Sequence, residues 1–335
     1  MAPEGPHNGP PPRNASVVAD LIALGGAGLA VVDLGEGGVP ALGPGVVCVG
    51  VHDGGPRPWS GFEACDILLT TDENPPSPWI GVGSLDAALA PIADQVAAQP
   101  AAAAACAQVL RASLQLGFEQ ALAQESLAYS MLLASEGFLG WRAANPPRSR
   151  PDDPGPRVLI GEAEGGLMLR LNRAHARNAF DARMRDELCA ALAFAAEHPD
   201  APPVILSGEG PAFSAGGDLD EFGRHGDPGQ AHLIRVLRSA AQGVRNLGPR
   251  ITARLHGACV GAGIEVPAAA SRVTAAEGSF FRLPEVSMGL IPGAGGTATI
   301  PRRIGRQRTC WMAISGEDVD LATALAWGLV DEVSA

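Results

Sequence analysis

Three glycine-rich segments in the C-terminal half of the chain constrain its fold more than any other feature. They are residues 212–219, 256–265 and 283–297. Small residues ahead of a helix let the backbone approach a ligand and point free N–H groups at it. When two such turns converge on one oxygen atom, they form an oxyanion hole. The three segments therefore predict a ligand site built from backbone.

Tight helix packing would be the better explanation for a single glycine-rich turn. Here two of the three segments also carry a glutamate, Glu265 and Glu285. Glu265 stands between Ile264 and Val266, and a carboxylate among apolar neighbours is rarely buried without a partner or a task. The combination favours a catalytic or binding site over packing alone.

Strand and helix patterns alternate from about residue 157 onward. Apolar runs at 158–160 and 167–169 predict a hairpin, and residues 203–208 predict a buried strand that ends in a turn. The spacing of apolar residues over 182–196 predicts an amphipathic helix. Such alternation is typical of α/β proteins that bind ligands in loops at the ends of strands.

The N-terminal half is organised differently. Two apolar runs, 46–49 and 67–69, predict buried strands in a segment whose role the residues do not reveal. Ser84 is suited to cap a helix over 85–98, and Pro100 to open a second helix. The expected segments are a disordered tail at 1–15, the strand-containing segment at 16–83, helices at 84–144, a proline-rich linker at 145–156 and an α/β core at 157–335.

Charge and composition argue against several partners. The net charge is −12, the pI is near 5.0, and all 24 basic residues are Arg. This balance disfavours nucleic acid or an anionic membrane as a partner, but it is compatible with a local arginine-lined phosphate site. The six cysteines show no metal-ligand spacing, so we expect reduced thiols and no metal. No signal peptide or membrane-spanning apolar run is visible, so we expect a cytoplasmic protein.

Four motifs follow one another in the second half of the chain. They are residues 171–180, A-F-x-A-G-x-D-L at 212–219, G-A-x-x-G-x-G-x-E at 257–265 and P-E-x-x-x-G-L-I-P-G-x-G-G-T at 284–297. Their order and spacing resemble the crotonase (enoyl-CoA hydratase/isomerase) superfamily over nearly all of 157–335. The resemblance implies an α/β fold whose core is a spiral of ββα repeats. It also implies an acyl-CoA substrate, with no cofactor other than the coenzyme A of that substrate.

The resemblance assigns catalytic roles to four residues. The backbone N–H groups of Ala215 and Ala262 would form the oxyanion hole. The family usually has glycine at the position of Ala262, so the extra methyl group would narrow the site. Glu265 and Glu285 fall where hydratases of the family keep two catalytic glutamates, whereas isomerases and other branches commonly retain one.

The resemblance also predicts how substrate binds. Ala176 and Arg177 correspond to positions that contact the adenosine part of CoA, and Arg173 or Arg177 would meet its phosphates. The alternative for each arginine is a solvated surface charge. The resemblance further implies that three glycines, Gly293, Gly295 and Gly296, shape the acyl pocket.

One departure from the family concerns the order of segments. Ordinary members continue past a segment like 327–333 with a helical tail that closes the active site and packs between subunits. Residues 84–143 resemble that tail, which suggests a circular permutation joined by the linker. The alternative is an unrelated helical appendage. A transposed tail should bury, on its helix near 118–133, an apolar stripe that includes Leu122, Leu127 and Met131.

Three classes of function remain open at this level. Hydration of an α,β-unsaturated acyl-CoA leads, because both glutamates are present beside the two hole motifs. Another crotonase reaction, such as isomerisation, C–C hydrolysis or oxygenation, is the second reading, and a non-catalytic CoA-binding subunit is the third. The resemblance implies a homotrimer or a dimer of trimers. The acyl group cannot be read from these residues.

Overall fold

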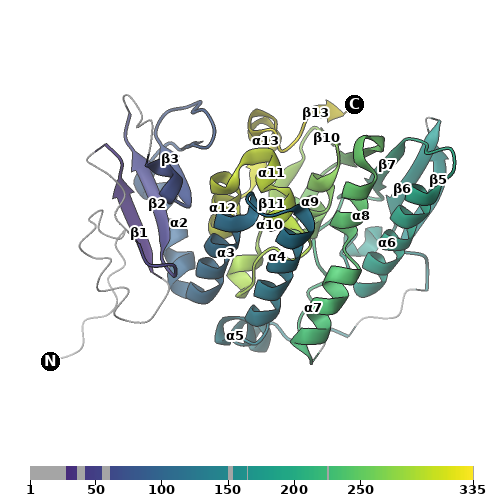
Figure 1. The fold of residues 1–335 in the computed structure, drawn as a ribbon, viewed down its shortest axis with the longest axis horizontal. Helices are drawn as coiled ribbons and strands as arrows, with labels where there is room; N and C mark the ends of the chain where they lie inside the picture. Colours follow the sequence, from purple (N-terminus) through teal and green to yellow (C-terminus); the bar gives the residue numbers. More distant parts are fainter. Residues whose placement is uncertain are drawn as a thin grey trace.

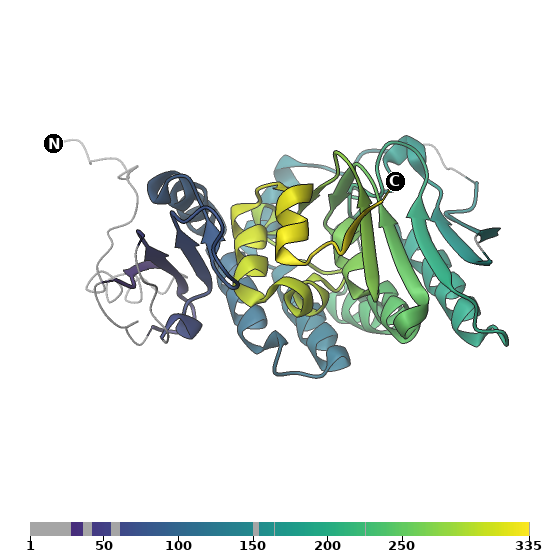
Figure 2. The same cartoon turned by 90° about the horizontal axis from the view of Figure 1, so that it is seen from above.

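The computed structural model describes residues 28–35, 42–54, 61–149, 154–163, 165–224 and 226–334. The predicted tail at 1–15 and residues 150–153 of the predicted linker lie outside these ranges. The chain forms an elongated body with a small sheet at one end and a β-hairpin at the other, and helices fill the space between them (Figures 1 and 2).

The core contains two sheets, and the chain passes from one to the other several times. The larger sheet has the strand order β13-β10-β8-β7-β6-β5, and the smaller has the order β12-β11-β9. The larger sheet consists of β5 (Val158–Ala163), β6 (Gly166–Leu171), β7 (Val204–Gly208), β8 (Ile251–Leu255), β10 (Arg272–Ala276) and β13 (Glu332–Ser334). The smaller consists of β9 (Ala258–Val260), β11 (Phe280–Arg282) and β12 (Val319–Asp320). Only β5 and β6 pair antiparallel in the larger sheet, as the predicted hairpin.

The chain repeats one path through these sheets. It runs along β8, turns into β9 and enters the short helix α9 (Ala262–Glu265). It then runs along β10, turns into β11 and enters the 3-10 helix Glu285–Met288. A strand of each sheet followed by a helix is a ββα unit, so the α/β prediction is confirmed. Both predicted glutamates lie in the helix that ends such a unit.

Helices cover the sheets and pack on them through buried residues that recur at helical spacing. In α6 (Ala182–Glu197), Met184, Leu188 and Leu192 lie four residues apart and are fully buried. The Asp181 side chain caps this helix by accepting a hydrogen bond from the Met184 N–H at 2.7 Å. The other core helices are α7 (Pro228–Leu237), α8 (Ala240–Asn246), α10 (Gly296–Thr299), α11 (Pro301–Ile304), α12 (Arg306–Ser315) and α13 (Leu321–Trp327).

Four helices precede the core in sequence and pack against it in space. They are α2 (Leu85–Ala98), α3 (Pro100–Ser113), α4 (Phe118–Leu132) and α5 (Glu136–Ala144). The predicted starts are confirmed, since Ser84 Oγ accepts from the Ala87 N–H at 3.3 Å and Pro100 is the first residue of α3. α3 packs on α12 and α10, and α4 packs on α10 and α7.

The predicted apolar stripe on α4 is wrong in two of its three members. Leu122 is buried, but Leu127 and Met131 are 58% and 61% exposed. At about 100° per residue, Leu127 and Met131 lie roughly 140° and 180° around the helix from Leu122. The face that α4 buries instead follows helical spacing through Leu122, Glu125 or Ser126, and Tyr129.

The small sheet at the N-terminal end is parallel throughout, with the order β1-β2-β3-β4. Its strands are β1 (Leu29–Asp33), β2 (Val47–His52), β3 (Ile67–Thr70) and β4 (Ile80–Gly81), so both predicted strands are present. Buried Asp66 holds this sheet to the helices, because Arg111 of α3 binds both of its oxygens at 2.6 and 2.8 Å. Arg306 of α12 lies 3.6 Å from the same carboxylate.

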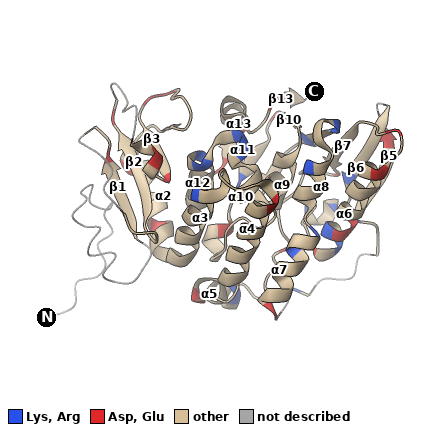
Figure 3. Cartoon of the chain, viewed as in Figure 1, with Lys and Arg blue, Asp and Glu red and all other residues tan. Residues whose placement is uncertain are grey.

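Residues of both charge signs are spread along the described elements, and neither sign is confined to one part of the chain (Figure 3). Within the described ranges, no helix combines the length and the apolar character needed to cross a lipid bilayer.

Candidate active site

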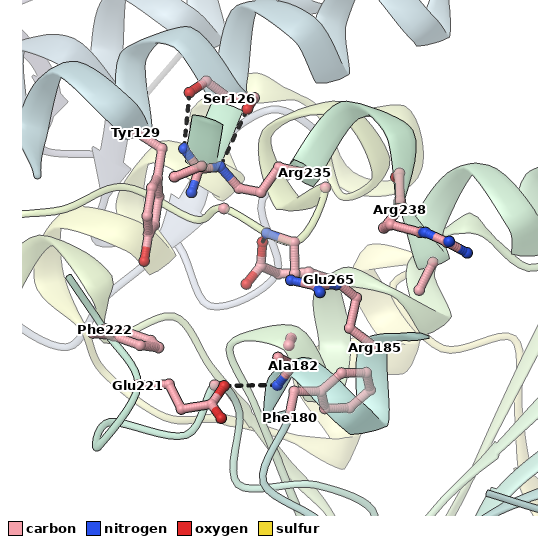
Figure 4. A pocket seen from close by; sticks show the side chains of 18 of the residues that line it. Ser126, Tyr129, Phe180, Ala182, Arg185, Glu221, Phe222, Arg235, Arg238 and Glu265 are labelled. Atoms are coloured by element: carbon pink, nitrogen blue, oxygen red, sulfur yellow. Dashed lines mark hydrogen bonds between the residues drawn. The ribbon is translucent and has the colours of Figure 1, made fainter. Parts of the chain in front are cut away.

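A cavity of about 400 Å³ lies where α4, α6, α7 and α9 meet the third glycine-rich segment (Figure 4). Both predicted catalytic glutamates line it, together with Ala262, Gly293 and Gly295. The sequence segments around 180, 217, 262, 285 and 294 therefore converge on one space. This convergence is what the spacing of the three glycine-rich segments predicted.

Glu265 enters the cavity from the last position of α9 and is 2% exposed. Its Oε2 accepts hydrogen bonds from the backbone N–H groups of Ala294 at 2.8 Å and Gly296 at 2.9 Å. Backbone donors of this kind stabilise the ionised form of a carboxyl group. Gly296 therefore has a different role from the predicted one: it does not line the cavity but holds Glu265.

Glu285 lines the same cavity from the start of its 3-10 helix and is 6% exposed. Its Oε2 is buried and has no hydrogen-bond partner among the described residues. Its Oε1 lies against Gly261, where an added Cβ would collide with it. Gly261 also has a φ of 50°, so both conformation and space require glycine at the turn into α9.

The different partners of the two glutamates separate their proton affinities. Burial raises the pKa of Glu265 to about 7, against the opposing effect of its backbone donors. Burial raises the pKa of Glu285 well above its ordinary value, and the nearby charge of Glu265 adds to that rise. Glu265 therefore loses its proton at a lower pH than Glu285, so the two groups can act as base and acid at the same pH.

Two backbone N–H groups face the same space. Gly217 and Ala262 both line the cavity, and neither N–H donates to another described residue. The prediction of Ala215 as a donor is wrong, because its N–H donates to the Arg177 carbonyl at 2.9 Å. The bridge between Phe180 and Gly217 sets the peptide directions here and leaves the Gly217 N–H free instead.

Comparison with known proteins identifies the family. The enoyl-CoA hydratase/isomerase family model matches residues 162–335. The chain belongs to this family. It is 33% identical over 175 residues to the mevalonyl-coenzyme A hydratase SIDH of Beauveria bassiana, covering 50% of this chain and 62% of that protein. It is 30% identical to the 2,3-dehydroadipyl-CoA hydratase of Escherichia coli, over 52% of this chain and 68% of that protein.

A solved structure agrees with the sequence matches. The enoyl-CoA hydratase of Thermoplasma volcanium GSS1 superposes with a TM-score of 0.50 at 30% identity, over 54% of this chain and 72% of that one. The chain thus spans less than two thirds of the Beauveria relative, and the matched family segment begins after the helices α2–α5.

The predicted CoA contacts have mixed outcomes in this member of the enoyl-CoA hydratase/isomerase family. The prediction that Arg173 binds a phosphate is wrong, because its side chain is buried and paired. Arg173 is 8% exposed, and its Nη1 lies 2.6 Å from Asp218 and 3.4 Å from Asp181. A buried, paired guanidinium is a structural element rather than a free anion receptor. Ala176 and Arg177 occupy a surface turn outside the cavity lining, and Arg177 is exposed.

The sequence analysis expected the helices at 84–143 to close the active site, but it singled out no residue of α4 as part of the cavity. Glu125 and Tyr129 both line the cavity, and Tyr129 lies so close to Gly293 that an added Cβ there would collide with its ring. Arg235 of α7 stacks over Tyr129 at 4.5 Å and donates to Ser126 Oγ at 3.2 Å (Figure 4). The available signal was helical spacing, which places Glu125 on the same face of α4 as Leu122 and Tyr129.

The raised pKa of Glu285 implies that this residue makes the stability of the protein depend on pH. A folded-state pKa above the unfolded value gives stability that is present at low pH and is lost as pH rises through the folded pKa. Glu285→Gln removes this titration while keeping the shape of the side chain. We expect the melting temperature of the variant, relative to wild type, to rise by about 2–4 °C between pH 5 and pH 8.

Differential scanning calorimetry measures this difference. Glu277→Gln, at an exposed turn between β10 and β11, is the matched control and should track wild type at both pH values. A melting-temperature difference for Glu285→Gln that does not change with pH would contradict the prediction.

Proposed function

We propose that this protein hydrates an α,β-unsaturated acyl-CoA thioester. One observation carries the proposal: the buried carboxyl groups of Glu265 and Glu285 line a cavity together with Gly217 and Ala262, whose backbone N–H groups have no partner among the described residues. Addition of water to an activated double bond requires one base, one acid and a site for developing negative charge.

The proposed reaction assigns each group one step. The N–H groups of Gly217 and Ala262 donate hydrogen bonds to the thioester oxygen and stabilise its negative charge as the enolate forms. The Glu265 carboxylate removes a proton from water, and the water oxygen bonds to Cβ. Glu285 delivers its proton to Cα, and the π electrons of the double bond end in the new C–H bond. Activity then falls at low pH as Glu265 protonates, and at high pH as Glu285 ionises.

Hydration is favoured over the alternatives within the family. Isomerisation needs a proton moved between carbons, for which one carboxyl group suffices, whereas this cavity holds both Glu265 and Glu285. Both curated relatives described above carry hydratase names, which supports the same direction. The intact pair of carboxyl groups also disfavours a non-catalytic CoA-binding subunit.

The substrate side of the proposal rests on the family. Coenzyme A enters as part of the substrate, with Ala176 and Arg177 at its adenosine end, and no metal or separate cofactor takes part in the steps above. Gly293 and Gly295 bound the acyl side of the cavity. We further propose a cytoplasmic location, which suits six cysteines that are all unpaired.

We also propose that α2–α5 are the family's C-terminal helical tail, transposed by circular permutation. Two features support this proposal. The helices pack on the core rather than standing apart from it, and α4 closes one side of the cavity. A tail that covers the active site is the role expected of this segment in the family.

A homotrimer or dimer of trimers is the assembly we propose. Four exposed apolar side chains on neighbouring helices support it: Leu127 and Met131 of α4, and Leu233 and Leu237 of α7. Their exposed fractions range from 58% to 79%, and α4 packs directly against α7. Large exposed apolar side chains gathered on adjacent helices are typical of subunit interfaces.

Removing either ionisable oxygen should abolish most of the turnover. We expect Glu265→Gln and Glu285→Gln each to lower hydration by about two to four orders of magnitude, the usual contribution of a general acid or base. Binding of a saturated acyl-CoA should persist in both variants. The loss of enoyl-thioester absorbance, with crotonyl-CoA and with longer or aryl enoyl-CoAs, measures the rate. Near-normal turnover by both variants on the best substrate would refute the assignment.

The oligomer prediction concerns the face formed by α4 and α7. Sedimentation of the wild type at micromolar concentration should give a trimer or hexamer, and Leu237→Glu should shift it to smaller species because a charge cannot be buried unpaired. Ile160→Glu, on the hairpin at the far end of the molecule, should leave the assembly unchanged. A wild-type monomer would count against the proposal.

The permutation predicts that segment order is interchangeable. Residues 157–335 alone should aggregate or fail to bind acyl-CoA, because the surface covered by α3 and α4 becomes exposed. Moving 84–143 behind residue 335 through a short linker should restore a soluble, active protein. A fully active, well-folded 157–335 fragment would show that the helices are an independent appendage.

A further inference from the structure

Glu125 is a further buried carboxyl group at the cavity, and the mechanism above does not use it. It lies in the middle of α4 and is 2% exposed. Its Oε1 accepts from the Gly295 N–H at 2.7 Å, and its Oε2 accepts from the Thr297 N–H at 2.8 Å and the Thr297 hydroxyl at 2.7 Å. Burial, followed by the charge of Glu265, raises the pKa of Glu125 to about 8, whereas these three donors favour its carboxylate form.

The donors of Glu125 alternate with those of Glu265 along one stretch of backbone. The N–H groups of Ala294 and Gly296 point to Glu265, whereas those of Gly295 and Thr297 point to Glu125. Successive N–H groups of residues 294–297 are therefore held in alternation by two carboxyl groups. The stretch contains two glycines, and Gly295 has a φ of 113°, so the backbone itself does little to fix these directions.

We propose that Glu125 is a positioning residue for the catalytic carboxylate: it fixes the peptide groups of residues 294–297 so that their alternate N–H groups hold Glu265. The inference rests on the proposed function for its catalytic meaning, and it identifies α4, outside the matched family segment, as part of the catalytic apparatus. Without Glu125 the Gly295 and Thr297 donors would be buried and unpaired, and the stretch would turn to satisfy them.

The contact between Glu125 and residues 294–297, here called the clamp, also acts through the charge of Glu125. The pKa of Glu285 is raised by burial first, then by the charge of Glu265, and further by that of Glu125. The other titratable or charged groups around these carboxyls are Tyr129 of α4, Cys106 of α3 and Arg235 of α7. Removing the Glu125 charge should therefore let Glu285 ionise at lower pH and move the alkaline limb of the activity profile downward.

The decisive comparison uses Glu125→Gln and a matched control, Glu119→Gln, at an exposed position in the first turn of the same helix. Glutamine keeps one oxygen acceptor and places an N–H donor opposite a backbone donor. We expect kcat to fall by about 10- to 100-fold, the effect of small misplacement of a catalytic group. The alkaline limb should move to lower pH, with KM and binding of saturated butyryl-CoA nearly unchanged. The control should match wild type in all four measurements.

A second variant keeps the test independent of folding. Thr297→Val removes only the hydroxyl donor to Glu125, so kcat should fall less than in Glu125→Gln, and the two changes together should be less than additive. An unchanged kcat and pH profile in Glu125→Gln, or in Thr297→Val if the first variant does not fold, overturns the proposal.

Hydrogen exchange separates this inference from the proposed function. Amides of residues 293–297 should exchange faster in Glu125→Gln than in wild type or Glu119→Gln, whether or not the protein hydrates enoyl-CoA. If wild type lacks hydratase activity while exchange in this stretch rises, the proposed function fails and the clamp stands. If exchange does not change, the clamp itself is absent.

Discussion

The site depends on how buried negative charge is satisfied by backbone N–H groups. A carboxylate removed from water is costly unless donors replace its hydration. Here Glu125 and Glu265 draw their donors from one glycine-rich stretch, while Glu285 has an oxygen with no partner among the described residues. The two kinds of environment separate a base from an acid within one cavity. Glycine is needed along the stretch because its peptide groups face alternate sides at close range.

Helices outside the matched family segment are bound into the molecule by polar contacts as well as apolar ones. α4 joins the core through Glu125, and α3 joins the N-terminal sheet through Arg111 and Asp66. Arg306 of α12 reaches the same aspartate, so one buried carboxylate connects the small sheet, the helices and the core. The small sheet is thereby tied to the helix layer that closes the cavity.

Local patterns allowed much of the fold to be predicted from the sequence. The cap at Ser84, the start at Pro100 and the hairpin depend on neighbouring residues, and each is present. Glu265 and Glu285 could be singled out because motif spacing places both on loops that converge. The orientation of peptide groups and the contacts between residues far apart in sequence were harder to predict. The Ala215 peptide faces Arg177 because of a bridge between Phe180 and Gly217, which motif spacing does not encode.

Arg173 and Glu125 illustrate the same limit. The partners of Arg173 include Asp218, far along the chain, so an arginine suited to bind phosphate is instead buried in an ion pair. Helical periodicity marks Glu125 as part of a face but cannot reveal that the face is buried against backbone donors. The stripe through Leu122, Leu127 and Met131 failed because residues five and nine apart do not share one side of a helix.

The sequence separation within the clamp has a consequence for how the protein folds. Glu125 meets Gly295 and Thr297 across 170 and 172 residues. Contacts that close so long a loop carry a large entropic cost and tend to form late. During synthesis α4 leaves the ribosome well before residues 294–297 are made, so Glu125 at first lacks its hydrogen-bond donors. The chain must therefore be synthesised at least to residue 297 before the catalytic backbone can take its final shape, so active-site formation follows the folding of α4.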